Sequence, residues 1–481
     1  MSNDILDPLR DLNRTTPDRV ALKSRSRPDA SVSQLLQIVD TAHALFAEHG
    51  VGPGSRIATI LPNAPETSVA ILAIAAFATC VPMNPAYALD ETRRLLAQSG
   101  VTHLVTDTTL MPNATAAAVA LGIPVLHLTA IAGPTGAFRL RPFKLRRRIA
   151  AADVPDTASR SPIALVLHTS GSTGAPKRVP LSAENLISSA WNVARSIELG
   201  SADVCLNMMP MFHIGALVDL LLAPLYAGGS TAFAEGISSE AFFRGLRHFN
   251  PTWSQAVPTV LHDLLAHGAN VDDADLVRNL RLIRAVSQPL PIRLHEEFEK
   301  IFGTVLVPMF GMTETAGLIT STPLGRSKPG SVGVPVGSRV MICDSLGNEV
   351  AVHKRGEVLV SGPNVMAGYE GPPSASRDTF KGDWLRSGDE GFIDEDGFLF
   401  LTGRLKDIIN RGGEKISPLE IDMILADHPD IAEAAAFPLP HPSLGEEVAA
   451  AVVPRDKKKL DARDVIDHLR GRAADFKIPW S

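Results

Sequence analysis

The sequence predicts an α/β protein with a large N-terminal domain of stacked αβ layers and a smaller α+β C-terminal domain. Three observations support this fold class. The chain has 481 residues, of which 45% are hydrophobic and 20% charged, enough for a large core and more than one domain. Short apolar runs alternate with helical patterns through the first part of the chain, as strand–helix–strand units do. Beyond Arg404 a shorter unit follows, with its own strand, glycine turn and helix.

The N-terminal part supplies the first strands and helices. "QLLQIVDTAHALFAEHG" has apolar residues at helical spacing and stops at Gly50, so it predicts a helix. "RIATILP" and "THLVTD" predict buried strands of a parallel sheet. "SVAILAIAAFATCVPM" is about 16 residues long and rich in alanine, which favours a buried helix over a membrane span. The basic run over residues 143–153 predicts a solvated connection rather than a site for an anionic surface.

The middle of the chain repeats one design, a strand that ends in a polar turn. "IALVLH", "LRLIRAVSQPLP" and "VLVPMFGMTET" follow it, and "PTWSQAVPTVLHDLLAHG" predicts a strand and then a helix. "FIDEDGFLFLTGR" alternates around Asp396 and Gly397, which predicts a hairpin. We place the domain boundary at Arg404 to Lys406, giving domains over residues 1–403 and 404–481.

Composition excludes several classes of function. The net charge is −6, so nothing global points to nucleic acid or to a membrane surface. The three cysteines, Cys80, Cys205 and Cys343, are far apart and suggest neither disulfides nor a zinc site. The N-terminus lacks the cationic and apolar regions of a signal peptide. We therefore expect a reduced, cytoplasmic protein.

The segment "HTSGSTGAPKRVPLS" is suited to binding phosphate. It follows a predicted strand, its glycines bring backbone N–H groups close to an anion, and Lys177 adds a mobile positive charge. The hydroxyl donors and glycines are Thr169, Ser170, Gly171, Ser172, Thr173 and Gly174. No Gly-Lys-Ser/Thr triplet closes the segment, so it is not a Walker A loop. The competing interpretation is a flexible polar turn.

This segment resembles the phosphate-loop signature of the adenylate-forming superfamily, which includes acyl-CoA synthetases, adenylation domains and luciferases. It departs from the pattern at Arg178, where a glycine is usual, and this arginine either slows loop movement or adds charge toward the phosphates. Four further segments resemble family signatures in the family's order: "MPMFHIGAL", "MFGMTET", "WLRSGDEG" and "LTGRLKDIINRGGEKISPLEID". "INRGGEKISP" and "HTSG" look most like oxalyl- and medium-chain-type acyl-CoA synthetases.

The resemblance implies a two-step reaction. A carboxylate attacks the α-phosphate of ATP, giving acyl-AMP and pyrophosphate, and a thiol, CoA by preference, then attacks the activated carbonyl. Catalysis must be mostly charge neutralisation and positioning, since an anion meets a polyanion. A carrier-protein thiol or an amine is the alternative acceptor.

The resemblance also implies roles for single residues. Glu314 would hold Mg²⁺, Thr313 would donate to the α-phosphate, and Asp389 would accept from both ribose hydroxyls. Arg404 would lie against the ribose and phosphate. The expected nucleotide-binding residues around the adenine and the Thr-Glu pair are Ser287, Gln288, Pro289, Phe310, Gly311 and Met312.

The implied acyl pocket begins at His213, which would border the substrate carboxylate. The other expected pocket residues are Ile214, Gly215, Ala316 and Gly317. His213 offers no fixed negative charge for a substrate amine, so an α-amino acid is disfavoured. Asp219 lies six residues further on, and at helical spacing its side chain could face elsewhere. Neither pocket segment contains an arginine or lysine, so we expect a small, mostly apolar monocarboxylic acid.

The C-terminal unit would move between the two steps. The resemblance makes Lys406 the hinge and places Gly412 and Gly413 on the path of the thiol. The chain ends at "DFKIPWS", before the family's usual C-terminal lysine. Lacking such a charge typically costs about 3–4 kcal/mol, or 10²–10³ in rate. We expect a truncated chain, the front of a longer one, or a non-catalytic protein that binds nucleotide or acyl-AMP.

Overall fold

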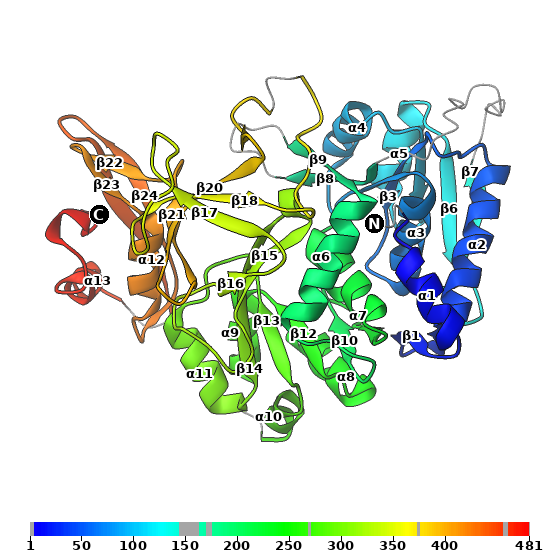
Figure 1. The fold of residues 1–481 in the computed structure, drawn as a ribbon, viewed down its shortest axis with the longest axis horizontal. Helices are drawn as coiled ribbons and strands as arrows, with labels where there is room; N and C mark the ends of the chain where they lie inside the picture. The colour runs from blue at the N-terminus through cyan, green and yellow to red at the C-terminus, as the bar shows by residue number, and fades with distance from the viewer. Residues whose placement is uncertain are drawn as a thin grey trace.

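The computed structural model describes residues 4–143, 163–169, 176–267, 271–372, 376–455 and 460–480. It confirms the predicted class: α/β layers form the large N-terminal part, and a small α+β unit follows (Figure 1). The basic run beyond residue 143 lies outside the described residues, as do Ser170, Gly171, Ser172, Thr173 and Gly174.

A seven-stranded sheet organises the N-terminal residues. Its strands, in spatial order, are β7 (Phe138–Phe143), β6 (Val125–Ala130), β5 (His103–Thr106), β3 (Arg56–Ile60), β4 (Thr79–Pro82), β8 (Ile163–Thr169) and β9 (Lys177–Ser182). The inner strands are parallel and the β6–β7 and β8–β9 pairs are antiparallel. The accompanying helices are α2 (Val32–Glu48), α3 (Pro65–Phe77), α4 (Leu89–Gln98) and α5 (Pro112–Ala120). The apolar segment predicted as one helix therefore divides between α3 and β4, because Thr79 and the residues after it join the sheet.

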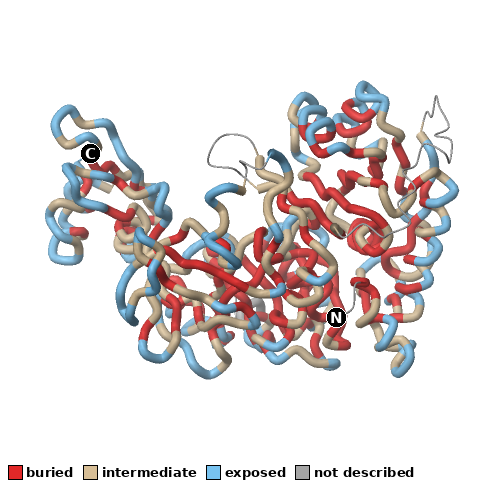
Figure 2. The backbone as a smooth tube through the Cα atoms, turned by 45° about the horizontal axis from the view of Figure 1, so that its top comes forward, coloured by how far each residue is buried: buried red, intermediate tan, exposed pale blue. Residues whose placement is uncertain are grey.

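A nine-stranded sheet forms the middle of the molecule. Its order is β16 (Val334–Pro335), β15 (Gly317–Ser321), β14 (Val305–Met312), β13 (Leu282–Ala285), β12 (Trp253–Ala256), β10 (Val204–Asn207), β11 (Ser230–Phe233), β1 (Val20–Ser24) and β2 (Arg27–Ser31). Its helices are α1 (Asp7–Thr15), α6 (Ala183–Ser196), the π-helix η2 (Gly215–Leu222), α7 (Ala223–Tyr226), α8 (Ser239–Phe249), α9 (Pro258–His267), α10 (Val271–Arg278) and α11 (Ile292–Phe302). One apolar cluster joins the two sheets through α3 and α6, which produces the stacked layers. Figure 2 shows that buried backbone concentrates in these layers.

A five-stranded antiparallel sheet leads to the predicted domain boundary. It contains β17 (Arg339–Cys343), β18 (Gly356–Ser361), β19 (Phe380–Lys381), β20 (Trp384–Ile393) and β21 (Leu399–Arg404). The predicted hairpin around Asp396 and Gly397 is confirmed, and Gly397 has the positive φ that this turn requires.

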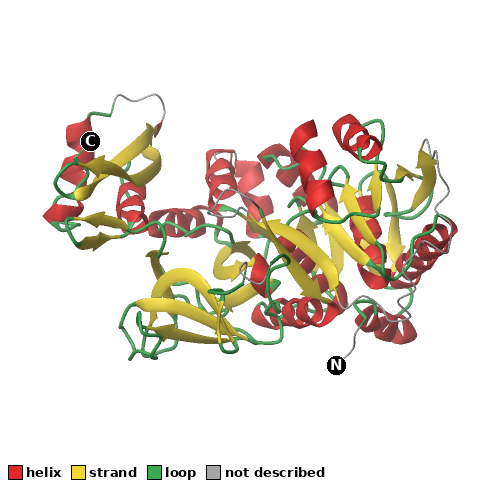
Figure 3. Ribbon diagram, turned by 90° about the horizontal axis from the view of Figure 1, so that it is seen from above, coloured by secondary structure: helices red, strands yellow, loops and turns green. Residues whose placement is uncertain are grey.

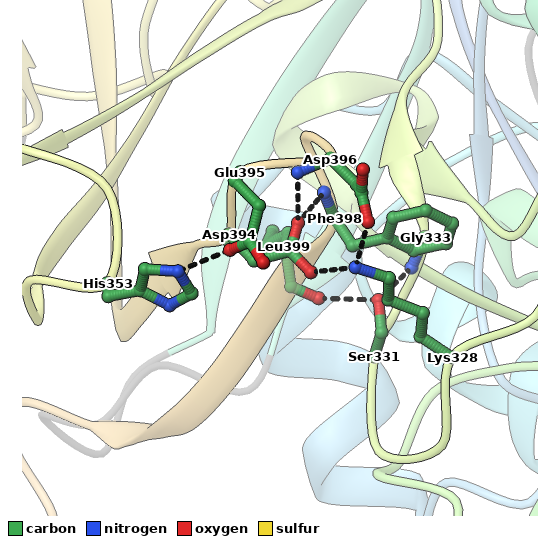
Figure 4. Close-up of polar contacts among 9 residues, drawn as sticks. All are labelled: Lys328, Ser331, Gly333, His353, Asp394, Glu395, Asp396, Phe398 and Leu399. Carbon is green, nitrogen blue, oxygen red and sulfur yellow. Dashed lines mark hydrogen bonds and ion pairs between the residues drawn. The ribbon is translucent and has the colours of Figure 1, made fainter.

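Polar contacts fasten the tip of the β20–β21 hairpin to the preceding loop (Figure 4). Asp394 accepts from the backbone N–H groups of Asp396 and Phe398, and Lys328 pairs with the carboxylates of Asp394 and Asp396. Ser331 donates to the carbonyl of Leu399. The hairpin, whose opposite end contains Asp389 and Arg404, is thereby fixed in the large part of the molecule.

The C-terminal unit has a separate four-stranded sheet and a separate core. Its strands are β23 (Glu414–Ile416), β22 (Ile409–Arg411), β25 (Gly445–Pro454) and β24 (Ile431–His441), and its helices are α12 (Pro418–Ala426), α13 (Ala462–Leu469) and the 3₁₀ turn η6 (Asp475–Lys477). Figure 3 shows this unit set apart from the large sheets. In the described part of the chain, every helix is too short or too polar to cross a bilayer.

Candidate functional site

Two predicted phosphate-binding residues frame a hairpin. Thr169 ends β8, Lys177 begins β9, and the two are paired across the strands. The residues between them up to 175 lie outside the described part of the chain. The two predicted residues on either side of the glycine-rich segment are therefore brought together by the β8–β9 pairing.

A single tyrosine contacts both Lys177 and the predicted metal ligand. The Lys177 Nζ atom lies 4.4 Å from the centre of the Tyr369 ring, and the Tyr369 hydroxyl donates to Glu314 Oε1 at 2.6 Å. Burial and the neighbouring Glu314 carboxylate raise the pKa of the Tyr369 phenol, which keeps it a hydrogen-bond donor. Glu314 is only 6% exposed and lies in the short 3₁₀ turn η3 (Thr313–Thr315) that follows β14. Lys177, Tyr369 and Glu314 therefore form one connected group.

The residues around Glu314 fit a magnesium ion that arrives with a nucleotide. Mg²⁺ is usually bound by one or two protein carboxylates together with substrate phosphates. Within the described ranges, no group of three or more His, Cys, Asp or Glu side chains is arranged to hold a metal alone. Glu314 supplies a buried carboxylate linked to Lys177 through Tyr369, so the protein would share the ion with phosphate oxygens.

Asp389 and Arg404 are paired across β20 and β21. Arg404 Nε lies 3.0 Å from Asp389 Oδ1, and the second carboxylate oxygen, Oδ2, is buried without a hydrogen-bond partner. Burial raises the pKa of the Asp389 carboxyl, although Arg404 opposes the shift. The Glu314 charge acts in the same direction as burial, so the two carboxylates influence each other across the site. One oxygen rather than two is free to accept from a ribose hydroxyl.

The predicted adenine turn follows β13. Ser287, Gln288 and Pro289 are exposed there, and Ser287 adopts φ +72°, a conformation that costs a non-glycine residue energy. Phe310 is buried at 8% exposure. At Gly311, a Cβ would lie 1.9 Å from the carbonyl oxygen of Gly317, so this position excludes any side chain.

Arg178 pairs with Glu370. Its Nε atom lies 3.3 Å from Glu370 Oε2. The Nη1 and Nη2 atoms of Arg56 donate to the two oxygens of the same carboxylate, each at 2.9 Å. The prediction that Arg178 adds charge toward the phosphates stays a prediction, and the Glu370 carboxylate beside it offsets part of that charge. The other prediction, slower loop movement, agrees with an arginine that ties β9 to the segment carrying Tyr369 and Glu370.

The predicted acyl segment begins at an exposed histidine and continues into a π-helix. His213 contacts the Phe212 ring, with 4.4 Å between ring centres, and partial desolvation lowers the pKa of the imidazole. Ile214 precedes η2, which begins at Gly215. A cavity of about 320 Å³ adjoins this segment and is lined mainly by apolar side chains. Its wall includes Met211, Phe212, Met83, Ile71 and Leu61.

A buried ion pair lies directly behind Gly215, where the sequence predicted no cation. Arg284 Nη1 lies 3.0 Å from Asp219 Oδ2 and donates to Gln255 Oε1 at 3.1 Å. Arg284 and Asp219 are 0% and 2% exposed. A Cβ on Gly215 would lie 2.8 Å from Gln255 Nε2 and 3.7 Å from Asp219 Oδ2. Asp219 is four residues after Gly215 and lies on the same side of η2, and Arg284 comes from β13 rather than from either predicted segment.

The other predicted pocket residues lie on the opposite side of the same ion pair. Ala316 is buried, and Gly317 has φ +112°. A Cβ on Gly317 would lie 3.2 Å from Asp219 Oδ1 and 3.6 Å from Ser189 Oγ. The structure thus brings the two predicted acyl segments together around Asp219.

The predicted hinge and thiol-path residues lie in turns after β21. Lys406 comes two residues after Arg404, and its Nζ atom lies 4.0 Å from Asp407 Oδ1. Gly412 and Gly413 connect β22 to β23 with φ of +60° and +99°, and Gly412 donates to the carbonyl of Leu444 at 2.8 Å. Both glycines are needed for the turn, whatever else they do.

Sequence reasoning missed three residues: Tyr369, Arg284 and Glu370. Tyr369 and Glu370 lie in "MAGYEG", whose small residues carried no chemical signal, and each contacts partners far away in the chain. Arg284 had one available signal, since it is a lone charge in an otherwise apolar strand. A cation at such a position needs a buried partner.

Comparisons with known proteins agree with this geometry. A family model described as AMP-binding enzyme matches residues 9–370, and one described as AMP-binding enzyme C-terminal domain matches residues 420–480. The chain is 35% identical to an oxalate–CoA ligase of Arabidopsis thaliana, over 98% of this chain and 92% of that protein. It is 34% identical to a sulfoacetate–CoA ligase of Cupriavidus necator, over 90% of this chain and 84% of that protein. The crystal structure of ATP-bound MatB from Rhodopseudomonas palustris matches with a TM-score of 0.86 and 26% identity, covering 100% of this chain and 94% of that one.

Proposed function

Because this chain belongs to the family of AMP-binding enzymes and joins a carboxylic acid to CoA through an acyl-AMP, we propose that both steps occur around Lys177, Glu314 and Asp389. The observation that carries this proposal is the connected group formed by Lys177, Tyr369 and Glu314. It couples a cation beside the glycine-rich segment to the buried carboxylate that suits a nucleotide-borne metal. Relatives named as ligases favour an enzyme over a non-catalytic nucleotide-binding protein.

In the proposed nucleotide site, each charge has one task. Lys177 neutralises phosphate oxygens, and Asp389 Oδ2 accepts a hydrogen bond from a ribose hydroxyl. Arg404 holds the other oxygen of Asp389 and lies beside the phosphate. Ser287 to Pro289 and Phe310 would enclose the adenine. Glu314 would hold Mg²⁺, which supplies neutralisation of the phosphate charge when it is bound.

The proposed first step places the acid at His213. An oxygen of the substrate carboxylate bonds to the α-phosphorus, the bond to the bridging oxygen breaks, and pyrophosphate leaves. Thr313 donates its hydroxyl to the α-phosphate as charge builds there. The thiol sulfur of CoA then bonds to the acyl carbon, AMP leaves, and the thiol gives up its proton. Partial desolvation lowers the pKa of His213, which favours the neutral imidazole. A neutral imidazole forms no ion pair with the substrate carboxylate, so that carboxylate stays available to react.

Two classes of acid compete for the pocket. The mostly apolar monocarboxylic acid predicted from sequence is supported by the cavity next to Phe212 and by Ile214 and Ala316. An acid with a second charged group is supported by Arg284 behind Gly215 and by relatives named for oxalate and sulfoacetate.

We propose that residues 404–481 move as a unit about Lys406 between the two steps. The support is a change of sheet: β21 ends at Arg404, and the next strand, β22, pairs only within the C-terminal sheet. Gly412 and Gly413 would then border the path of the thiol. A cytoplasmic location stays a prediction, and the free, buried state of Cys80, Cys205 and Cys343 is compatible with it.

The proposed site is tested by Glu314→Gln, with Glu240→Gln on the exposed face of α8 as the matched control. We expect Glu314→Gln to reduce Mg²⁺-dependent ATP–pyrophosphate exchange by about 10²–10³-fold, with an unchanged unfolding midpoint. Glu240→Gln should keep the wild-type rate. Normal exchange by Glu314→Gln would exclude Glu314 as the metal ligand.

The acceptor is tested by thioester formation. We expect the pre-formed acyl-AMP to react with CoA and to give acyl-CoA detectable by mass spectrometry. Pantetheine, a carrier protein and hydroxylamine serve as competing acceptors. Faster consumption by a carrier protein or an amine than by CoA would favour those alternatives.

A further inference from the structure

The three guanidinium nitrogens of Arg284 differ in whether they have hydrogen-bond partners. Its Nη1 nitrogen serves both Asp219 and Gln255, while Nε and Nη2 are buried and have no hydrogen-bond partner. Nε and Nη2 form the edge of a guanidinium that binds a carboxylate or a sulfonate through two parallel hydrogen bonds. The Arg284 side chain is 0% exposed, so solvent at the surface does not satisfy this edge. A fully buried two-donor edge without a partner indicates a missing acceptor.

The neighbouring unsatisfied atoms indicate the same kind of ligand. Ser189 Oγ is buried without a partner, and so is Asp219 Oδ1. Both atoms lie close to where a Cβ of Gly317 would be, at 3.6 Å and 3.2 Å. The two guanidinium N–H groups and the serine hydroxyl supply three donors, against a single unpaired carboxylate oxygen. The excess of donors favours a ligand group rich in acceptor oxygens.

Two glycines of the predicted acyl segments pack directly against this group. Gly215 lies in front of Gln255 and Asp219, and Gly317 lies in front of Asp219 and Ser189. Each glycine removes a side chain that would otherwise stand between the predicted acyl segments and the ion pair. Resting on the proposed function, which puts the reacting carboxylate at His213, the free edge of Arg284 would receive the far end of a small acid.

We propose that the acid carries a second oxyanion, a carboxylate or a sulfonate, and that the Nε–Nη2 edge of Arg284 binds it. Asp219 and Gln255 hold the guanidinium in place through Nη1, and Ser189 adds a third donor. Arg284 is thus a specificity-determining residue that never contacts the reacting carboxylate. This explains why the cation is held by only one of its nitrogens. The Asp219 carboxylate repels any anion that comes close to it. We therefore expect only an anion small enough to reach the nearby donors of Arg284 and Ser189 to bind.

The test compares acids with and without a second oxyanion in the full chain. Oxalate, malonate and sulfoacetate are measured against acetate and propionate by ATP–pyrophosphate exchange and by CoA thioester formation. We expect kcat/KM to be about 10–100-fold higher for at least one acid with a second oxyanion, as two charge-assisted hydrogen bonds allow. The carboxylate and sulfonate members distinguish the two oxyanions. Exchange with acetate or propionate alone would overturn this inference and leave the proposed function standing, whereas exchange with no acid of any class would overturn the proposed function.

Arg284→Lys provides the sharper variant. A lysine keeps the charge beside Asp219 and loses the two-donor edge. We expect it to raise KM for the preferred acid by about 10–100-fold, with a much smaller change in kcat, because the contact is remote from the reacting atoms. Arg281→Lys, three residues earlier and bound to Ile197 and Asp203, is the matched control and should keep the wild-type KM.

A second variant guards against misfolding. In Asp219→Leu/Arg284→Met both charges are removed together, which proteins often tolerate better than the loss of one. We expect this double variant to lose the preference for the second oxyanion by about 10–100-fold. A folded double variant that keeps the preference, or an Arg284→Lys variant with wild-type KM, would contradict the role of Arg284.

Discussion

Two aspartate–arginine pairs, one beside the acyl segments and one beside the nucleotide segments, have the same nitrogen–oxygen distance of 3.0 Å and opposite surroundings. Arg284 is 0% exposed and is held by strand, π-helix and Gln255. Arg404 is 54% exposed and ends the last strand before the small unit. Equal distance therefore does not mean equal role. Both aspartates are buried, so the two pairs differ in the exposure of their arginines, and Arg404 is the one that lies where the proposed movement of the small unit begins.

The largest effect should come from breaking each pair by removing its arginine. Arg284→Met leaves Asp219 buried and uncompensated, so we expect a loss of about 3–5 kcal/mol in the free energy of unfolding. Arg404→Met should cost less, about 1 kcal/mol, since the Arg404 side chain is 54% exposed and solvent screens its charge, although Asp389 itself is buried. Urea denaturation followed by circular dichroism measures both. Equal losses would show that exposure does not separate the two pairs.

The next largest effect should be on AMP affinity, which we expect to depend on Asp389 and not on Asp219. Asp389→Asn removes the charged acceptor with the free Oδ2 atom, and we expect AMP to bind about 10–100-fold more weakly. Asp383→Asn, an exposed aspartate in the turn before β20, is the control and should bind AMP normally. Isothermal titration calorimetry gives both affinities. A similar loss in Asp219→Asn would mean that the acyl-side pair also supports the nucleotide site.

The two sides of the site should also differ in the sign of their pH dependence. Burial, assisted by Arg178, lowers the pKa of His168 to about 4. The ordinary pKa of histidine is 6.5, so between pH 6.5 and pH 4 the unfolded chain binds a proton at His168 that the folded protein does not bind. The free energy of unfolding therefore falls as the pH drops from 6.5 toward 4. Burial raises the pKa of Asp219, which makes stability fall as the pH rises above the ordinary value of 3.8.

Replacing His168 tests this sign. His168→Gln should remove on the order of 1–2 kcal/mol of the stability lost between pH 6.5 and pH 4, allowing for partial solvent access. The measurement is the urea midpoint at several pH values, compared with wild type so that other histidines cancel. An unchanged slope would show that His168 titrates in the folded protein much as it does in the unfolded chain.

The smallest effect should come from the link between Lys177 and Glu314. Tyr369→Phe keeps the ring beneath Lys177 and removes only the hydrogen bond to Glu314, which is worth about 0.5–1.5 kcal/mol. We expect the Mg²⁺ concentration for half-maximal exchange to change by about 2–10-fold. The unfolding midpoint is the second readout, and Tyr87→Phe is the control. An unaltered Mg²⁺ dependence would make Tyr369 a packing residue only.

Local pattern was enough to predict the strands and turns that carry the site. β8, β12, β13 and β14 are short apolar runs that end in polar or glycine-rich turns, and the Asp396–Gly397 hairpin follows from turn chemistry. The grouping of Glu314 with Asp389 followed from a family resemblance rather than from periodicity. These residues are far apart in the chain, and only the fold places their charges within reach of each other.

The pocket chemistry was harder to predict because its charges come from outside the motif segments. Helical spacing left open which way the Asp219 side chain faces, and in η2 it pairs with Arg284. Arg284 lies in a strand of only four residues. Such a short run of sequence does not show which face of the strand each side chain occupies, or what packs against that face. Tyr369 reaches Glu314 across 55 residues of sequence. Side-chain direction and long-range pairing, which the sequence leaves open, decide these contacts.

The winding of η2 has a consequence for how this pocket can change over evolution. A π-helix differs from an α-helix by the equivalent of one inserted residue. Deleting a single residue between Gly215 and Asp219 would let the segment rewind as an α-helix, in which residues three or four apart still lie on one face. The segment could therefore lose one residue over evolution without separating the Asp219 carboxylate from Arg284.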